Sequence, residues 1–133
     1  MLFSGLNMSF GPERAGLVGR NGVGKSTVLL NLIVRHADVD IVVESLAVLG
    51  LKAKLGRHLL DRHGYLAGRD EDRAADVMEM FTDPDVDAVH ALRGGWGCAR
   101  LLPHLDLDVI ARNPKILLGY SDVTALLLPV FAK

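Results

Sequence analysis

The chain has 133 residues, half of them hydrophobic and 23% charged, and its formal net charge is −1. This length suits one domain with a single core, and the composition is that of a folded rather than a disordered protein. A net charge so close to zero provides no broad basic field, which argues against binding to nucleic acid or to an anionic membrane.

The cysteine count and the two ends of the chain bear on the cellular compartment. Cys98 is the only cysteine, so no internal disulfide can form and a reducing compartment is the default. The first charged residue is Glu13, and residues 1–10 lack the basic start of a secretion signal. The apolar residues 125–132 are too few to cross a bilayer. We therefore expect a cytoplasmic protein.

Near the amino terminus, a short apolar strand over residues 15–18 precedes a full match to the phosphate-binding pattern G-x-x-x-x-G-K-[ST]. In this pattern the glycines turn backbone N–H groups toward a phosphate, the lysine reaches the β- and γ-phosphates, and the hydroxyl holds magnesium. We expect an apolar helix to begin at Lys25 and to add its positive end. The candidate nucleotide-binding residues are Gly19, Asn21, Gly22, Gly24, Lys25, Ser26 and Thr27, with Ser26 binding magnesium only if a nucleotide binds.

Residues 2–33 resemble the opening of an ABC-type ATPase, in which the run L-V-G-R-N-G-x-G-K-S-T is characteristic. The resemblance implies ATP and magnesium at this loop. No later stretch resembles the signature or the Asp-Glu pair that hydrolysis requires, so turnover is not expected. No Gly/Ser/Pro linker follows at residues 35–40. We therefore expect a P-loop strand–loop–helix segment over residues 1–34 that is continuous, within one domain, with residues 35–133.

The next stretch alternates between helical and strand patterns. Apolar residues at helical spacing predict a helix over residues 39–49, which Gly50 would end. Alternating apolar and lysine residues over 51–55 predict a strand with one wet face, at an edge of the sheet. A connecting loop follows. The five histidines show neither an H-x-x-x-H nor a Cys/His pairing, so no metal site is expected.

A second helix and a buried strand come next. Asp70 is expected to cap the helix, whose far side is strongly acidic and expected to face solvent. Residues 86–92 are nearly all apolar, as in a central parallel strand covered on both faces. The predicted buried stripe of the helix consists of Ala74, Val77, Met78 and Phe81.

Two loops at the ends of strands carry the candidate chemistry. The run Arg93-Gly94-Gly95-Trp96-Gly97 follows the buried strand, where ligands bind in open α/β sheets. Two short helices over 99–102 and 107–111 lead to a strand at 116–118, then to Gly119 and Ser121-Asp122 at the start of a helix. A serine on such a turn suits a nucleophile whose oxyanion is bound by N–H donors. The alternative is that Ser121 and Asp122 simply cap the helix.

Together these elements predict an α/β three-layer sandwich with a mostly parallel sheet. Residues 40–128 resemble the N-terminal domain of the LD-carboxypeptidases (muramoyltetrapeptide carboxypeptidases), serine peptidases that trim peptidoglycan peptides in bacteria. The resemblance depends on three blocks, in the order that the family has: Arg57-His58 with H-G-Y-L-A-G at 63–68, R-G-G-W-G at 93–97, and N-P-K at 113–115 leading into G-Y-S-D at 119–122. It implies the flavodoxin-like half of such an enzyme.

The resemblance also implies roles for individual residues. Ser121 would be the nucleophile, and the backbone N–H groups of Asp122 and Gly95 would stabilise the oxyanion. The substrate pocket would include Arg93, Gly94, Trp96, Gly97 and Tyr120, with Trp96 in place of the family's usual tyrosine. No cofactor or metal is required.

In the family, the general-base histidine and its glutamate come from a C-terminal domain, whereas this sequence stops at Lys133. We therefore expect a nucleophile-bearing part of an enzyme that releases D-Ala from muramoyl tetrapeptide, inactive alone. Two alternatives stay open: an ATP-binding P-loop module and an inert fused fragment. Apolar surface left uncovered on a half-enzyme favours a homodimer.

Overall fold

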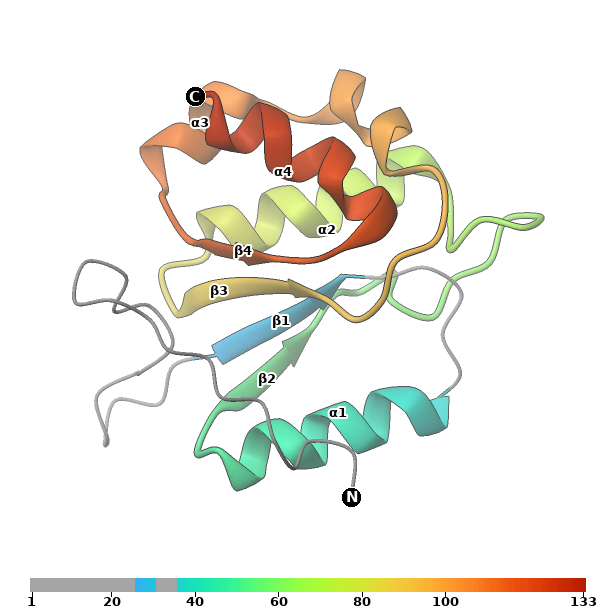
Figure 1. Ribbon diagram of the computed structural model, residues 1–133, viewed down its shortest axis with the longest axis vertical. Helices are drawn as coiled ribbons and strands as arrows, with labels where there is room; N and C mark the ends of the chain where they lie inside the picture. The colour runs from blue at the N-terminus through green and yellow to red at the C-terminus, as the bar shows by residue number, and fades with distance from the viewer. Residues whose placement is uncertain (1–25, 31–35) are drawn as a thin grey trace.

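The computed structural model describes residues 26–30 and 36–133 (Figure 1). The strands of this part are β1 (Ser26–Leu30), β2 (Lys52–Leu55), β3 (Val86–Ala91) and β4 (Ile116–Leu118). The α-helices are α1 (His36–Val48), α2 (Asp70–Thr82), α3 (Leu107–Arg112) and α4 (Thr124–Phe131), and two 3-10 helices are η1 (Cys98–His104) and η2 (Ser121–Val123).

The described strands form one parallel sheet in the order β2-β1-β3-β4. Helix α1 lies on one face of this sheet, whereas α2, α3 and α4 lie on the other (Figure 1). This arrangement confirms the predicted α/β three-layer sandwich with a parallel sheet. It also brings the loops that follow β3 and β4 to the same edge, because the carboxyl ends of parallel strands point the same way.

Strand β1 corrects the expectation for the residues that follow the phosphate-binding pattern. Residues 26–30 form a strand rather than the expected apolar helix, and this strand pairs with both β2 and β3. A short apolar run is compatible with a buried strand or a helix, and here pairing in the sheet decides. The other candidate nucleotide-binding residues, Gly19, Asn21, Gly22, Gly24 and Lys25, lie outside the described residues, as does the expected strand at 15–18.

The predicted helix and edge strand between residues 39 and 55 are confirmed, but the predicted single wet face of the strand is wrong, because Leu55 is 41% exposed while Lys54 is half-buried. Helix α1 ends at Val48, where the Gly50 N–H donates to the carbonyl of Ala47 (2.9 Å) and the Leu51 N–H to that of Leu46 (2.9 Å). These contacts satisfy carbonyl groups that a helix end leaves without an intrahelical partner. Strand β2 lies at an edge of the sheet, as its pattern predicts.

The main core lies between the sheet and the α2–α3–α4 layer. Helix α2 buries Ala74, Val77 and Phe81 as predicted, but the third turn buries Met80 completely, while Met78 is only half-buried. Val89 of β3 is fully buried beneath this layer. No helix in the described part of the chain is long and apolar enough to cross a lipid bilayer.

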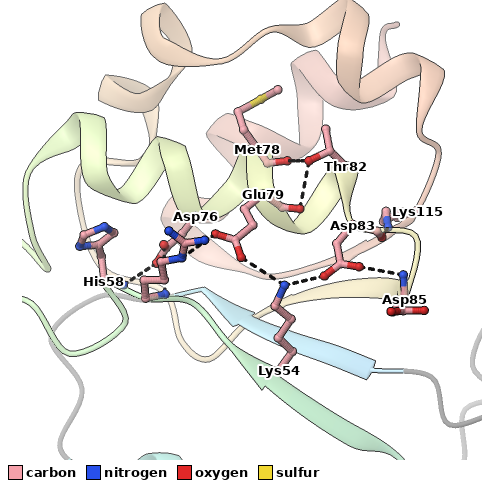
Figure 2. Close-up of polar contacts among 10 residues, drawn as sticks. Lys54, His58, Asp76, Met78, Glu79, Thr82, Asp83, Asp85 and Lys115 are labelled. Atoms are coloured by element: carbon pink, nitrogen blue, oxygen red, sulfur yellow. Dashed lines mark hydrogen bonds and ion pairs between the residues drawn. The ribbon is translucent and has the colours of Figure 1, made fainter.

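Ion pairs fasten the carboxyl-terminal end of α2 to the sheet, as Figure 2 shows. Lys54 of β2 donates to Glu79 (3.2 Å) and to Asp83 (2.5 Å), and Asp83 raises the pKa of Lys54 by accepting its hydrogen bond. Lys115, just before β4, donates to the backbone carbonyls of Asp83 and Val86. The two lysines thereby fix α2 relative to strands on both sides of β3.

Candidate functional site

Ser121 lies where the chain turns from β4 into η2. Its φ is +58°, and no other residue than glycine has a positive φ in the described ranges. A left-handed conformation costs an L-residue about 1–2 kcal/mol, and such strain is typical of a nucleophile on a sharp strand-to-helix turn. The side chain is exposed.

The capping alternative for Ser121 and Asp122 is wrong. Neither η2 nor α4 has a hydrogen bond from a side chain at its N-cap, and the N-cap positions belong to Tyr120 and Val123. The turn depends instead on close packing: a β-carbon on Gly119 would lie 2.3 Å from Cγ1 of the buried Val123. Only glycine fits there without a shift of the backbone or of Val123.

The glycine-rich loop at residues 93–97 follows β3, next to the turn that follows β4. A β-carbon on Gly94 would lie 2.7 Å from Cβ and 3.2 Å from Oγ of Ser121. The loop backbone therefore contacts the serine directly. Gly95, the residue after this contact, is exposed and adopts φ +156°. The structure thus brings together the serine and the loop that the sequence nominated for the oxyanion.

Aromatic side chains surround the loop. The rings of Trp96 and Tyr65 lie 5.6 Å apart between centroids at an angle of 58°, in the tilted arrangement that aromatic pairs favour. Both rings are more than half exposed, as is Tyr120 beside Ser121. Sequence reasoning missed Tyr65 as a site residue, although it belongs to the G-Y-L-A-G stretch that carries the family resemblance.

Asp122 uses its side chain in a way that the sequence did not predict. Its Oδ2 accepts a hydrogen bond from the backbone N–H of Cys98 at 2.8 Å, so it links the serine turn to the end of the glycine loop. Burial, together with a hydrogen bond to Asp122, raises the pKa of the Cys98 thiol to about 12. Cys98 is therefore a neutral, buried thiol and not a nucleophile.

The first turn of α2 approaches the glycine loop from the other side. Asp70 is the first helical residue, with Arg69 at the N-cap, so the predicted cap is wrong by one position. Its carboxylate pairs with Arg100 (2.7 Å) and with Arg73 (2.5 Å), and these hydrogen bonds, Arg100 foremost, hold the pKa of Asp70 below its ordinary value. Arg73 in turn donates to the carbonyl of Gly97 at 3.2 Å.

Asp76 shows that the acidic side of α2 is only partly solvated. It is 4% exposed, and its carboxylate accepts the backbone N–H groups of Arg57 (3.1 Å) and His58 (2.9 Å), seen in part in Figure 2. Burial raises the pKa of Asp76. The sequence did contain a signal for this burial. Asp76 is adjacent to Val77 and four residues before Met80, so it lies on the buried face of α2.

A small cavity of about 30 Å³ lies beneath the loop, lined among others by Arg73, Asp76 and Cys98. Ser121 is not among the residues that line it. In the described ranges, one group of side chains could hold a metal: His58, Asp61 and Asp72 have ligand atoms within 4.8 Å of one another. The Nδ1 of His58 lies 2.8 Å from Asp61, a hydrogen bond that raises the pKa of the histidine.

The described residues place an exposed serine beside the glycine loop, without a histidine at its hydroxyl. No histidine among residues 36–133 hydrogen-bonds the Ser121 hydroxyl. Two nominated residues lie elsewhere along the loop: Arg93 is exposed and lines the cavity, and Gly97 is buried against Leu66.

Comparisons with known proteins agree with this geometry. The chain is 47% identical over 88 residues to the probable murein peptide carboxypeptidase of Bacillus subtilis (strain 168), covering 66% of this chain and 28% of that protein. It is 43% identical over 90 residues to the murein tetrapeptide carboxypeptidase of Pseudomonas aeruginosa, covering 67% and 29%. The chain therefore spans less than a third of these relatives.

Solved structures give the same result. A crystal structure of muramoyltetrapeptide carboxypeptidase from Oxalobacter formigenes superposes with a TM-score of 0.74 at 30% identity, covering 80% of this chain and 36% of that one. The microcin C7 self-immunity protein MccF, in complex with aspartyl sulfamoyl adenosine, gives 0.71 at 33%, covering 83% and 34%. The family model of the LD-carboxypeptidase N-terminal domain matches residues 26–133. The chain belongs to the LD-carboxypeptidase family, and residues 26–133 correspond to its N-terminal domain.

Proposed function

We propose that this chain carries the nucleophile of a serine LD-carboxypeptidase that cleaves peptidoglycan peptides. The observation that supports this most directly is Ser121, exposed at φ +58° after β4 with Gly94 against it. In the proposed reaction, Ser121 Oγ attacks the carbonyl carbon of the bond before the terminal D-Ala. The backbone N–H groups of Asp122 and Gly95 receive the charge that develops on the carbonyl oxygen.

The proton balance of this step explains why the chain alone should not turn over. As the Oγ–carbon bond forms, the hydroxyl proton must move to a base, which later protonates the departing amine of D-Ala. In the resemblance, that base and its glutamate belong to a C-terminal domain. Losing both removes on the order of 10⁴-fold or more in rate, so we expect no measurable turnover by these 133 residues alone.

The names of relatives and the surface beside the serine support the proposed substrate class. A relative is named a murein tetrapeptide carboxypeptidase, which favours muramoyl tetrapeptide with release of D-Ala. MccF was solved with aspartyl sulfamoyl adenosine, an acyl group on a nucleoside, so a nucleotide-linked substrate is a second form to test. Trp96, Tyr65 and Tyr120 would form the wall against which either substrate lies.

A fluorophosphonate probe tests the nucleophile directly, because its fluoride leaves without protonation and a serine beside N–H donors can react with it slowly even without the general base. We expect slow labelling of Ser121, located by peptide mass spectrometry, that disappears in Ser121→Ala. Ser45→Ala is the matched control, since the Ser45 hydroxyl bonds to its own helix at the Ile41 carbonyl. Absence of labelling in the wild type would favour the inert fused fragment, and measurable D-Ala release by the chain alone would contradict the missing base.

Association and location complete the proposal. Leu128 and Phe131 of α4 are 65% and 91% exposed, which supports association with a second copy of the chain. Sedimentation at several concentrations tests it, and a monomer at every concentration would reject it. We infer a cytoplasmic location from the single, unpaired Cys98.

A further inference from the structure

One peptide unit at the end of the glycine loop is held from both sides. The carbonyl oxygen of Gly97 accepts a hydrogen bond from Nη2 of Arg73 at 3.2 Å. The next N–H along the chain, that of Cys98, donates to Oδ2 of Asp122 at 2.8 Å. These two groups belong to the same planar peptide, so the two side chains together fix the orientation of its plane.

The arginine of this pair is itself held firmly. The Arg73 side chain is 6% exposed, and its Nη2 lies 2.5 Å from Oδ1 of Asp70. The other oxygen of Asp70 binds Arg100, whose backbone N–H donates to the same Gly97 carbonyl at 3.2 Å. A single nitrogen of the buried guanidinium therefore bridges Asp70 and the Gly97 carbonyl, and a buried, paired side chain keeps its geometry better than a flexible surface one does.

The aspartate of the pair follows the proposed nucleophile directly in sequence. Any movement of Asp122 is therefore coupled to Ser121. The Cys98 N–H that Asp122 binds lies 24 positions earlier in the chain. The loop needs such a restraint, because Gly95 and Gly97 both have positive φ and glycine has more backbone freedom than any other residue.

We propose that Arg73 and Asp122 are positioning residues that clamp the Gly97–Cys98 peptide and so hold the glycine loop, residues 93–97, against Ser121. The proposal rests on the proposed function only in that the loop supplies an oxyanion donor. A displacement of about 1 Å can cost 10²-fold in rate, so the clamp matters for the chemistry as well as for the fold. A purely structural role, as a cap of η1, would instead affect the whole domain.

Hydrogen exchange at single amides separates these two roles. The experiment follows the Cys98 amide by NMR in the wild type, in Asp122→Ala and in Asp122→Asn, with Val89 in the core as the reporter of global opening. We expect exchange at Cys98 to be about tenfold faster or more in Asp122→Ala, with Val89 unchanged. Asp122→Asn, whose amide oxygen can still accept the bond, should lie between. Equal acceleration at both amides, or none at Cys98, would overturn the proposal.

The only tryptophan of the chain reports on the loop itself. Trp96 is expected to show a larger nanosecond component in its fluorescence anisotropy decay in Asp122→Ala. Arg73→Lys, which keeps a cation near Asp70 but lacks the planar guanidinium that places Nη2 between Asp70 and the Gly97 carbonyl, should move in the same direction. Asp108→Ala is the control, because it removes an exposed carboxylate paired with Lys133, away from the loop. Anisotropy identical in all four proteins would contradict the clamp.

Fluorophosphonate labelling of the same variants links the clamp to the chemistry. We expect Ser121 labelling at least tenfold slower in Asp122→Ala than in the wild type. Unchanged labelling despite faster exchange at Cys98 would overturn the positioning role. If the wild type is not labelled at all while the exchange and anisotropy effects appear, the proposed function fails and the clamp stands.

Discussion

A β-carbon placed on Gly94 would lie 2.7 Å from Cβ of Ser121, so the backbone of one loop touches the side chain of the other. This contact brings together residues that are 27 positions apart in the sequence, at the ends of the neighbouring strands β3 and β4. It also makes the packing of the site testable without any substrate.

Gly94→Ala should therefore destabilise the domain through its contact with Ser121. We expect a loss of about 1–3 kcal/mol in the free energy of unfolding, as for other overpacked sites, measured by urea titration. In a Ser121→Gly background the same substitution should cost clearly less, because the clashing carbon is gone. Equal costs in both backgrounds would show that the two residues do not contact each other.

The strain at Ser121 predicts a difference between two inactive variants. Both Ser121→Ala and Ser121→Gly remove the hydroxyl, but only glycine adopts φ +58° without steric cost. We expect Ser121→Gly to be the more stable of the two by about 1 kcal/mol in urea unfolding. An alanine variant as stable as the glycine variant would mean that the turn relaxes.

The thiol of Cys98 should be inert in the folded protein. Its side chain is buried, and its pKa of about 12 leaves almost no thiolate near neutral pH. We expect its reaction with a disulfide reagent to be more than about 10²-fold slower than in denaturant, where the pKa returns to an ordinary value. A native rate close to the denatured rate would contradict the burial of this residue.

The pair of His58 and Asp61 should make stability depend on pH. The hydrogen bond from Asp61 raises the pKa of His58 above its ordinary 6.5, so the folded chain holds this proton more tightly than the unfolded chain does. The contribution of this pair to stability is complete below the pKa of His58 in the unfolded chain. It disappears as the pH rises through the pKa of His58 in the folded chain. Asp61→Asn should therefore lower the free energy of unfolding at about pH 5.5, by less than about 1 kcal/mol because the pair is so exposed. At about pH 8.5 it should have little effect.

Urea titrations of the wild type and Asp61→Asn at the two pH values measure this difference. Asp108→Ala serves as the control for loss of an exposed carboxylate whose partner, Lys133, is not a histidine. A cost that is the same at both pH values would contradict protonation of His58 as its source.

The phosphate-binding pattern is expected not to bind ATP. Ser26 and Thr27 lie in strand β1, whereas the pattern requires them at the start of a helix whose positive end faces the phosphates. Isothermal titration with ATP and magnesium should show no saturable binding, with identical traces for the wild type and Lys25→Ala. Binding by the wild type that Lys25→Ala abolishes would restore the nucleotide-binding alternative.

The local sequence pattern was sufficient to predict most helices and strands and to place Ser121 at a turn after a strand. The helical spacing over 39–49 and the apolar run at 86–92 predicted α1 and β3, and the turn around Ser121 could be placed after a strand. For Ser26–Leu30 the same kind of evidence failed, because a five-residue apolar run has no periodicity that separates a strand from a helix. Pairing with β2 and β3 decided it, and pairing is not a local property.

The side-chain roles of Asp122 and Asp76 could not be predicted for a related reason. Both residues have ordinary local interpretations, as a helix cap and as part of a solvated face. Their actual partners are backbone N–H groups, at Cys98 for Asp122 and at Arg57 and His58 for Asp76, at least 18 residues away. Which unpaired N–H a carboxylate reaches depends on the packed fold.

The interior position of β1 has a practical consequence for anyone who trims this chain. The family match begins at residue 26, ahead of the joint that the sequence placed after residue 34, so cutting at that joint would discard the strand to which β2 and β3 are both hydrogen-bonded. The backbone N–H and C=O groups of β2 and β3 that now pair with β1 would be left unpaired, and such strand edges pair with strands of other molecules. A shortened gene should therefore begin before residue 26, even though the sequence there does not resemble the rest of the chain.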